Sequence, residues 1–320
     1  MQLNGLHHVT SVTARIGMNA DFYTRVLGLR LVKKSVNQDD VSAYHLFYAD
    51  KLGSPGTDIT FFDWSYMEPE QRGTDSIALT AFRVSGREAL DYWAERLAAH
   101  GVEHEGIEKF DGRPALRFAD PEGQRLMLVD DGGAEFEGEL WDGSDVPVEH
   151  ALRGFYAVML SVPVLRQVEP ILTQALQFRR ARKAQDSEGR SIVIYEMAEG
   201  GPGRELWVVE EPDQPRARLG AGGTHHVAFR VADRDAQSAW RERLLEAGLY
   251  VSPFTDRFYF RSIYFRISNG ILFEIATDGP GFGADEDLES LGEKLALPPF
   301  LESRREVIEA NLKPIVMEAG

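Results

Sequence analysis

Residues 223–231 read Gly223-Thr224-His225-His226-Val227-Ala228-Phe229-Arg230-Val231, and residues 5–10 repeat the opening of this pattern as Gly5-Leu6-His7-His8-Val9-Thr10. Each His-His pair opens a short run of apolar and β-branched residues, which predicts a β-strand. Four of the eight histidines in the chain lie in these two pairs. The echo predicts repeated structural units that carry equivalent strands.

Strand alternation predicts which histidine of each pair enters a common site. Successive side chains of a strand point to opposite faces. His225 is therefore predicted on the apolar face with Val227, Phe229 and Val231, and His226 on the opposite face. By the same phase His8 shares its face with Thr10. One histidine from each strand, His8 and His226, could then begin a metal site.

Composition limits what such a site can do. The chain has 320 residues, of which 43% are hydrophobic and 27% charged, so it can bury a large core. A formal charge of −16 without a basic stripe argues against a nucleic-acid partner. No signal peptide or long apolar run is recognisable, so a cytoplasmic, non-membrane protein is expected. With no cysteine, the metal ligands available are His, Asp and Glu.

The chain is predicted to contain four β-α-β-β-β units spaced by roughly 70 residues, which makes an internally repeated α+β fold. The predicted helices cover residues 19–28, 87–100, 164–176 and 235–247, each following the first strand of its unit. We expect an N-terminal domain over residues 1–131 with two units, a polar connector over 132–150, and a C-terminal domain over 151–320 with two units and a tail. The second unit aligns with the fourth so that Leu79 and Met127 stand at the positions of His226 and Glu274.

Glu274 interrupts the otherwise apolar strand Gly270-Ile271-Leu272-Phe273-Glu274-Ile275-Ala276. A buried carboxylate is costly without a partner or a metal. Two imidazoles and one carboxylate leave open positions on an octahedral ion, the facial triad associated with non-haem Fe(II) and O₂ chemistry. Since His8 is in the first unit and His226 and Glu274 are in the fourth, these two units are predicted to share one metal-bearing half-open barrel. The second and third units would form a second, metal-free barrel.

The sequence resembles the vicinal-oxygen-chelate superfamily, and within it the ring-cleaving dioxygenases of the para-hydroquinone 1,2-dioxygenase type. The similarity runs nearly end to end. The strings that carry it are Leu6-His7-His8-Val9-Thr10, Tyr44-His45-Leu46-Phe47-Tyr48-Ala49-Asp50-Lys51-Leu52-Gly53-Ser54-Pro55-Gly56-Thr57, Glu149-His150-Ala151-Leu152-Arg153-Gly154-Phe155, Asp256-Arg257-Phe258-Tyr259-Phe260-Arg261-Ser262-Ile263-Tyr264-Phe265, and the tail from Pro280-Gly281-Phe282 to Pro298-Pro299.

The resemblance implies Fe(II), with Mn(II) as an alternative, held by His8, His226 and Glu274. It also implies contacts to ligands or substrate by His7, Thr10, His225, Arg257 and Tyr264, among which His225 and Tyr264 are candidates for hydrogen bonding or proton transfer. A small aromatic substrate and O₂ are the implied partners, and a homo-oligomer is compatible with the family. The chain departs from the family pattern at residues 266–270 and at Tyr156.

Three other functions remain open at this stage. A glyoxalase-like isomerase would require a fourth protein ligand, typically a carboxylate, on the last strand of the first unit. Thr60, which is not a carboxylate, aligns with Glu274 on that strand. A binding protein that sequesters small molecules would need no metal ligands. A catechol-type extradiol dioxygenase would differ in substrate alone. The remaining histidines, His45, His100, His104 and His150, are predicted to be ordinary surface or core residues.

Overall fold

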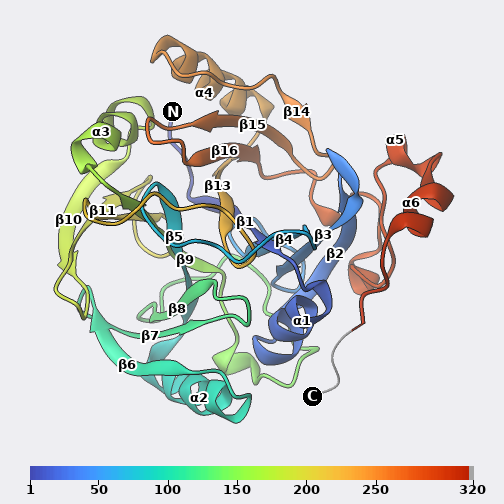
Figure 1. The fold of residues 1–320 in the computed structure, drawn as a ribbon, viewed down its shortest axis with the longest axis horizontal. Helices are drawn as coiled ribbons and strands as arrows, with labels where there is room; N and C mark the ends of the chain where they lie inside the picture. Colours follow the sequence, from blue (N-terminus) through green and yellow to red (C-terminus); the bar gives the residue numbers. More distant parts are fainter. Residues whose placement is uncertain (317–320) are drawn as a thin grey trace.

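The computed structural model describes residues 1–316 and contains four repeats of one β-α-β-β-β unit (Figure 1). The first unit consists of β1 (Leu6–Thr13), α1 (Ile16–Asp21), a π-helical turn (Phe22–Val26), β2 (Arg30–Asn37), β3 (Asp40–Ala49) and β4 (Asp58–Asp63). The second consists of β5 (Ser76–Val84), α2 (Gly86–Ala99), β6 (His104–Phe110), β7 (Arg113–Ala119) and β8 (Arg125–Asp130).

The third unit has β9 (Phe155–Val162), α3 (Leu165–Pro170), a π-helical turn (Ile171–Ala175), β10 (Arg179–Gln185), β11 (Ser191–Glu196) and β12 (Glu205–Glu210). The fourth has β13 (Thr224–Val231), α4 (Arg234–Glu246), β14 (Thr255–Asp256), β15 (Arg261–Arg266) and β16 (Leu272–Thr277). Short 3₁₀ turns occupy Val148–His150, Phe282–Ala284 and Leu288–Ser290, and α5 (Pro299–Glu302) and α6 (Arg305–Asn311) lie in the tail.

The predicted elements are found with small shifts at their ends. Each of the four predicted helices is present, but the first and third are short α-helices that continue into a π-helical turn. In the third unit Pro170 lies at this junction. Proline has no backbone N–H to donate, so a regular α-helix cannot continue unchanged through it.

Sixteen strands form two eight-stranded sheets, which curl into two half-open barrels. The first sheet has the order β14-β15-β16-β13-β1-β4-β3-β2, and the second has β10-β11-β12-β9-β5-β8-β7-β6. The first and fourth units therefore share one sheet, and the second and third share the other, which is the pairing predicted from the placement of the histidines. The seams are the antiparallel pairs β1 with β13 and β5 with β9. A division into domains at residues 131 and 150 stays a prediction.

Apolar side chains of the second sheet form a buried cluster of their own. Leu79 and Met127 are buried in this cluster, which includes Tyr156 and Trp207. Ala81 pairs with Met127 in the same register in which Ala228 pairs with Glu274. The second sheet thus has the scaffold of the first, with packed apolar side chains where the first has the polar residues His226 and Glu274.

The tail returns from the fourth unit to the first and covers the edge of β2. The backbone N–H of Ala296 donates to the carbonyl of Lys34 at 2.9 Å, and Lys34 forms a parallel bridge with Leu295. The buried Lys33 ammonium donates to Asp285 at 2.8 Å and also to Glu286. These contacts hold the tail across β2 and so protect an edge strand that would otherwise expose unpaired backbone groups.

No helix in residues 1–316 is long and apolar enough to span a membrane.

Candidate metal centre

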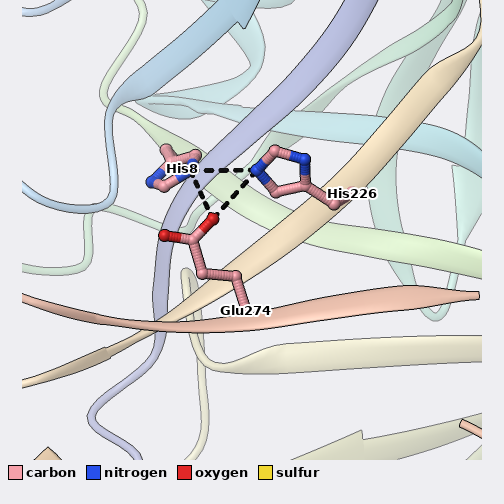
Figure 2. A group of neighbouring side chains, drawn as sticks. All are labelled: His8, His226 and Glu274. Carbon is pink, nitrogen blue, oxygen red and sulfur yellow. Dashed lines mark hydrogen bonds and ion pairs between the residues drawn. The ribbon is translucent and has the colours of Figure 1, made fainter. Parts of the chain in front are cut away.

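Three side chains from three strands converge in the first sheet (Figure 2). Nε2 of His226 lies 3.0 Å from Oε2 of Glu274, and Nε2 of His8 lies 3.3 Å from the same oxygen. The two Nε2 atoms are 3.3 Å apart. All three residues are buried, and this group could hold a metal ion.

The strand register explains why these residues meet. His8 of β1 pairs with Ala228 of β13, and Ala228 pairs with Glu274 of β16. The small side chain of Ala228 separates His8 from Glu274 in this row and leaves room above it. His226 pairs with Thr10 in the next row and reaches the same point.

The prediction that strand alternation places His225 on the apolar face with Val227 is wrong. The pairing of β1 with β13 shifts register at His7 and again at His225, as expected for β-bulges. Nδ1 of His225 lies 2.7 Å from Nδ1 of His226, so both rings are on the same side of the strand. The bulge locally breaks the two-residue period, which sequence alternation assumes.

The second sheet has register shifts at the equivalent positions, at Ala78 of β5 and Tyr156 of β9. The bulges therefore belong to the repeated fold rather than to the ligands. In the first sheet they turn His7 toward the ring of His8 and His225 toward the ring of His226, at positions where the second sheet has Tyr156 and Ala78.

Hydrogen bonds fix the ring nitrogens of the pair at residues 7 and 8. Nε2 of His7 lies 3.1 Å from the carbonyl oxygen of Thr277 and must donate to it, because a carbonyl only accepts. Nδ1 of neutral His7 is then an acceptor, and Nδ1 of His8 donates to it across 2.9 Å. Neutral His8 therefore presents the lone pair of Nε2 to the centre of the triad.

The same contact is repeated at residues 225 and 226, where Nδ1 of His226 can donate to Nδ1 of His225. Burial, followed by the neighbouring His8, lowers the pKa of His7 to about 3. Burial, followed by His226, lowers the pKa of His225 to about 3. Both rings are thus neutral at pH 7 and can act as acceptors for the predicted ligands.

The Glu274 carboxylate is suited to a cation. Burial alone would raise its pKa, but the positive charge and hydrogen bonds of protonated His8 and His226 would outweigh burial and hold the pKa of Glu274 well below the ordinary value, and a bound cation would take over this effect when the rings are neutral. Oε1 accepts a hydrogen bond from Ser262. Oε2, although close to both imidazoles, has no well-oriented hydrogen-bond donor among the described residues. A buried anionic oxygen beside two imidazole lone pairs is the donor set that a divalent metal requires.

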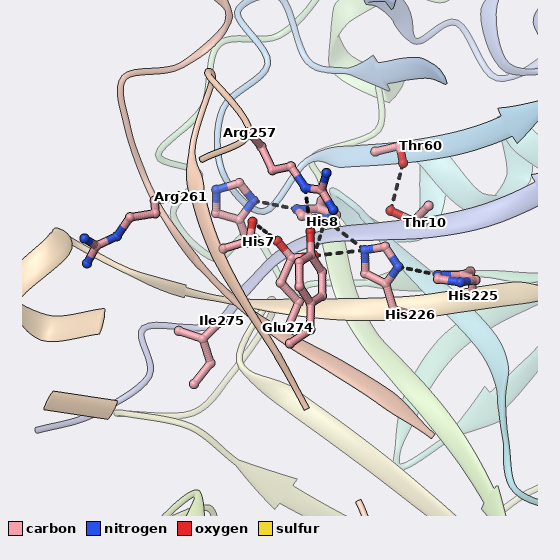
Figure 3. Close-up of polar contacts among 12 residues, drawn as sticks. His7, His8, Thr10, Thr60, His225, His226, Arg257, Arg261, Glu274 and Ile275 are labelled. Atoms are coloured by element: carbon pink, nitrogen blue, oxygen red, sulfur yellow. Dashed lines mark hydrogen bonds and ion pairs between the residues drawn. The ribbon is translucent and has the colours of Figure 1, made fainter. Parts of the chain in front are cut away.

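The triad forms one wall of a small cavity of about 40 Å³. Thr10, Arg257 and Tyr264 from the predicted set line it. His7 and His225 do not line it and instead contact the rings of His8 and His226 (Figure 3). Arg261 points away and bonds to Gln237 on α4 at 2.6 Å. Burial, reinforced by Glu274, raises the pKa of Tyr264, so its hydroxyl stays protonated at neutral pH.

Arg257 lines the cavity and connects two of its surrounding segments. Its guanidinium bonds to Asp39 at 2.8 and 3.3 Å, and its Nε donates to the Tyr264 hydroxyl at 3.1 Å. The side-chain amide of Gln38 donates to the Arg257 carbonyl at 2.9 Å. The turn between β2 and β3 is thereby clasped to the loop before β15.

Sequence reasoning missed His45 and the turn residues Gln38 and Asp39, which all line the cavity. His45 is on β3, and its Nε2 lies 2.8 Å from the hydroxyl of Thr60. The stretch from Tyr44 to Thr57, which carries part of the family resemblance, contains this histidine. A single histidine in a strand, without a repeated partner, does not show whether its side chain faces a functional cavity. Burial, followed by His8 and His226, lowers the pKa of His45 well below its ordinary value.

Thr60 occupies the position in the first unit that Glu274 has in the fourth. Thr60 pairs with Thr10 in the register in which Glu274 pairs with Ala228. Its hydroxyl donates to the Thr10 hydroxyl at 2.9 Å. At this position the first unit therefore offers the triad a hydroxyl and no carboxylate as a fourth ligand.

Comparison with known proteins agrees with this architecture. The model of the Glyoxalase/Bleomycin resistance protein/Dioxygenase superfamily matches residues 5–128 and 155–275. The "Putative ring-cleaving dioxygenase MhqA" of Bacillus subtilis (strain 168) is 46% identical over 316 residues, covering 98% of this chain and 100% of that protein. The "Chlorohydroquinone/hydroquinone 1,2-dioxygenase" of Sphingobium indicum is 32% identical, covering 99% and 98%.

A crystal structure of a "putative dioxygenase" from Bacillus subtilis superimposes with a TM-score of 0.91 at 36% identity, covering 100% of this chain and 99% of that one. Glyoxalase I from Zea mays shares the fold, with a TM-score of 0.61 at 15% identity over 86% and 92% of the two chains. The two half-open barrels are those of the vicinal-oxygen-chelate fold. From the match of both halves of the chain, the protein belongs to the Glyoxalase/Bleomycin resistance protein/Dioxygenase superfamily.

Proposed function

We propose that this protein is an Fe(II)- and O₂-dependent dioxygenase that cleaves the ring of a hydroquinone-type aromatic compound. The observation that carries the proposal is a buried His-His-Glu triad on the wall of a cavity that is also lined by five phenylalanine and tyrosine side chains. Two imidazoles and one carboxylate with open positions are typical of non-haem Fe(II) oxygenases. The names of the similar dioxygenases support an enzyme of the ring-cleaving kind.

His8, His226 and Glu274 would hold the metal, and bound Fe(II) would supply the redox connection between an electron-rich ring and O₂. The chain's own residues bind and orient the substrate. Phe47, Phe62 and Phe260 provide apolar walls, which favour an aromatic ring over a charged small molecule. We propose that the protein binds a small aromatic compound and O₂ at this site. We also propose that it acts in the cytoplasm.

Tyr264 and Arg257 are the polar groups nearest the triad on the β15 side. Tyr264 pairs with Glu274 across β15 and β16, so its side chain lies on the same face. The protonated Tyr264 hydroxyl receives a hydrogen bond from Nε of Arg257, which leaves its own proton free to donate to a substrate oxygen. Arg257 is a positioning residue in this proposal, and Tyr264 is a candidate proton donor.

Substrate entry should require movement of the clasp between Arg257 and Asp39. An apolar cavity of roughly 150 Å³ suffices to bind benzene in a protein interior, whereas the cavity beside the triad measures about 40 Å³. Asp39 is exposed, so its bond to Arg257 is screened by solvent and contributes little to stability. Breaking this ion pair would therefore cost little, and moving the turn away from the loop, with loss of the Gln38 hydrogen bond, would enlarge the cavity.

Metal analysis after anaerobic purification, followed by O₂ uptake with hydroquinone, tests the proposal. We expect one equivalent of iron per chain and consumption of one O₂ per ring cleaved. Mn(II) is the alternative metal and should be compared in the same assay. Stoichiometric zinc together with turnover of the methylglyoxal-glutathione adduct would overturn the dioxygenase proposal in favour of an isomerase.

Replacement of His225, which contacts the proposed ligand His226, gives a further prediction about iron content and turnover. His225→Ala should keep most of its iron but lose turnover by about 10- to 100-fold, because His226 loses the partner that orients its ring. Iron content and O₂ uptake measured on the same preparation check this. His100→Ala, remote from the triad, is the matched control, and complete loss of iron from His225→Ala would show that His225 is itself a ligand.

A further inference from the structure

His45 lies in the first sheet on the side of the cavity opposite Glu274. β3 is separated from β1 by β4, whereas β16 is separated from β1 by β13 on the other side. His45 and Glu274 both line the cavity, so the curled sheet brings these two distant strands to face one another. Each wall thus presents at least one polar side chain to a molecule bound between them.

The His45 ring is held in one orientation. It packs against Phe47 and Phe62, with ring centroids 3.9 and 4.5 Å away. Nε2 bonds to Thr60, whose hydroxyl proton is donated to Thr10. Thr60 therefore accepts from Nε2–H of His45, and this leaves Nδ1 as a hydrogen-bond acceptor. Nδ1 has no partner among residues 1–316.

The polar residues of the neighbouring turn that line the cavity are engaged with one another or with the loop before β15. Oδ1 of Asn37 accepts from the backbone N–H of Asp39, and the amide nitrogen of Gln38 donates to the carbonyl of Arg257. Both carboxylate oxygens of Asp39 accept from Arg257. His45 differs from these turn residues because it is carried by a strand, packed between aromatic rings, and left with an open acceptor.

We propose that Nδ1 of His45 accepts a hydrogen bond from the hydroxyl group of the substrate that is remote from the metal. This inference rests on the proposed function, in which one substrate oxygen is at the triad. In a para-hydroquinone the second hydroxyl lies at the opposite end of the ring, so a ring held at the triad directs it toward the far wall. His45 is then a specificity-determining residue that favours a hydroquinone over a monophenol.

Binding without turnover tests this role. Protein loaded with Fe(II) under argon is titrated calorimetrically with hydroquinone and with phenol, which lacks the second hydroxyl. The wild type should bind hydroquinone more tightly, by about 2- to 12-fold, the range expected for one neutral hydrogen bond. In His45→Phe, which keeps an aromatic ring but has no nitrogen, the affinity ratio should fall to about one.

Two further variants locate the contact on the ring. The side-chain amide of asparagine lies near the position of Nδ1, and that of glutamine lies near Nε2. His45→Asn should therefore keep the preference for hydroquinone, whereas His45→Gln should lose it while retaining the contact with Thr60. His104→Phe, in the second sheet, is the matched control and should keep the wild-type ratio. The iron content and circular dichroism of each variant establish that it is folded and loaded.

An unchanged ratio in His45→Phe, equal affinities in the wild type, or no binding of either compound would overturn the role of His45. O₂ uptake by the wild type with hydroquinone is measured separately in air. Uptake together with an unchanged ratio in His45→Phe refutes the role of His45 alone. Absence of ring cleavage, with the ratio changing as expected, refutes the dioxygenase proposal and leaves the hydroxyl contact in place.

Discussion

Tight Fe(II) binding is expected to disappear when His8, His226 or Glu274 is replaced by alanine, while the protein remains folded. Each variant leaves two donors, and the lost ligand cannot be replaced by Thr60, whose hydroxyl is held by Thr10 and His45. Glu274 offers the largest effect, because it is the anionic member of the triad and supplies the charge that attracts the metal. Iron content after anaerobic dialysis measures the loss directly.

Thermal unfolding provides a second measurement of the same prediction. A metal that binds the folded state alone stabilises the protein by about 2.7 kcal/mol at a free concentration of 100 times its dissociation constant. For a chain of this size this corresponds to a rise in Tm on the order of 5 °C. The wild type and the control His104→Ala should show this rise on addition of Fe(II), and the three ligand variants should not. Full iron content in any ligand variant would remove that residue from the site.

The second large effect is expected when the chain is cut between the two halves. A break between Gly132 and Gly133, both exposed, separates β1 with His8 from β13 and β16 with His226 and Glu274. Neither half alone should bind Fe(II) tightly, because the triad is assembled across the antiparallel seam between β1 and β13. Co-expression of the halves should restore both iron binding and ring cleavage.

The halves expose large apolar surfaces when separated, so co-expression is preferable to mixing purified fragments. An N-terminal half that carries His8→Ala is the matched control: it should still associate with the C-terminal half through the seam but should restore no iron binding. Tight binding of iron by the C-terminal half alone would contradict a site shared between the first and fourth units.

Local signals explain why so much of the fold could be predicted. The four first strands and the four helices follow from apolar periodicity, glycine stops and the echo of Gly-x-His-His, which are properties of neighbouring residues. The convergence of the candidate triad was also predictable, since a carboxylate in the apolar strand around Glu274 has few explanations other than a partner or a metal. His8 lies in the first unit and the other two candidate ligands lie in the fourth, and this was enough to predict which units share a sheet.

What the sequence determined by itself is therefore the repeat, the candidate triad and the pairing of units, because each is encoded in residue types at fixed spacing. The tertiary structure alone decided the directions of side chains. Bulges at His7 and His225 turn both members of each pair to one face, against the alternation of a regular strand. The approach of β3 to the triad brings His45 into the cavity, and the turn after β2 brings Asp39 to Arg257 across 218 residues. Such contacts depend on sheet curvature and on long-range register, which no local pattern of residues specifies.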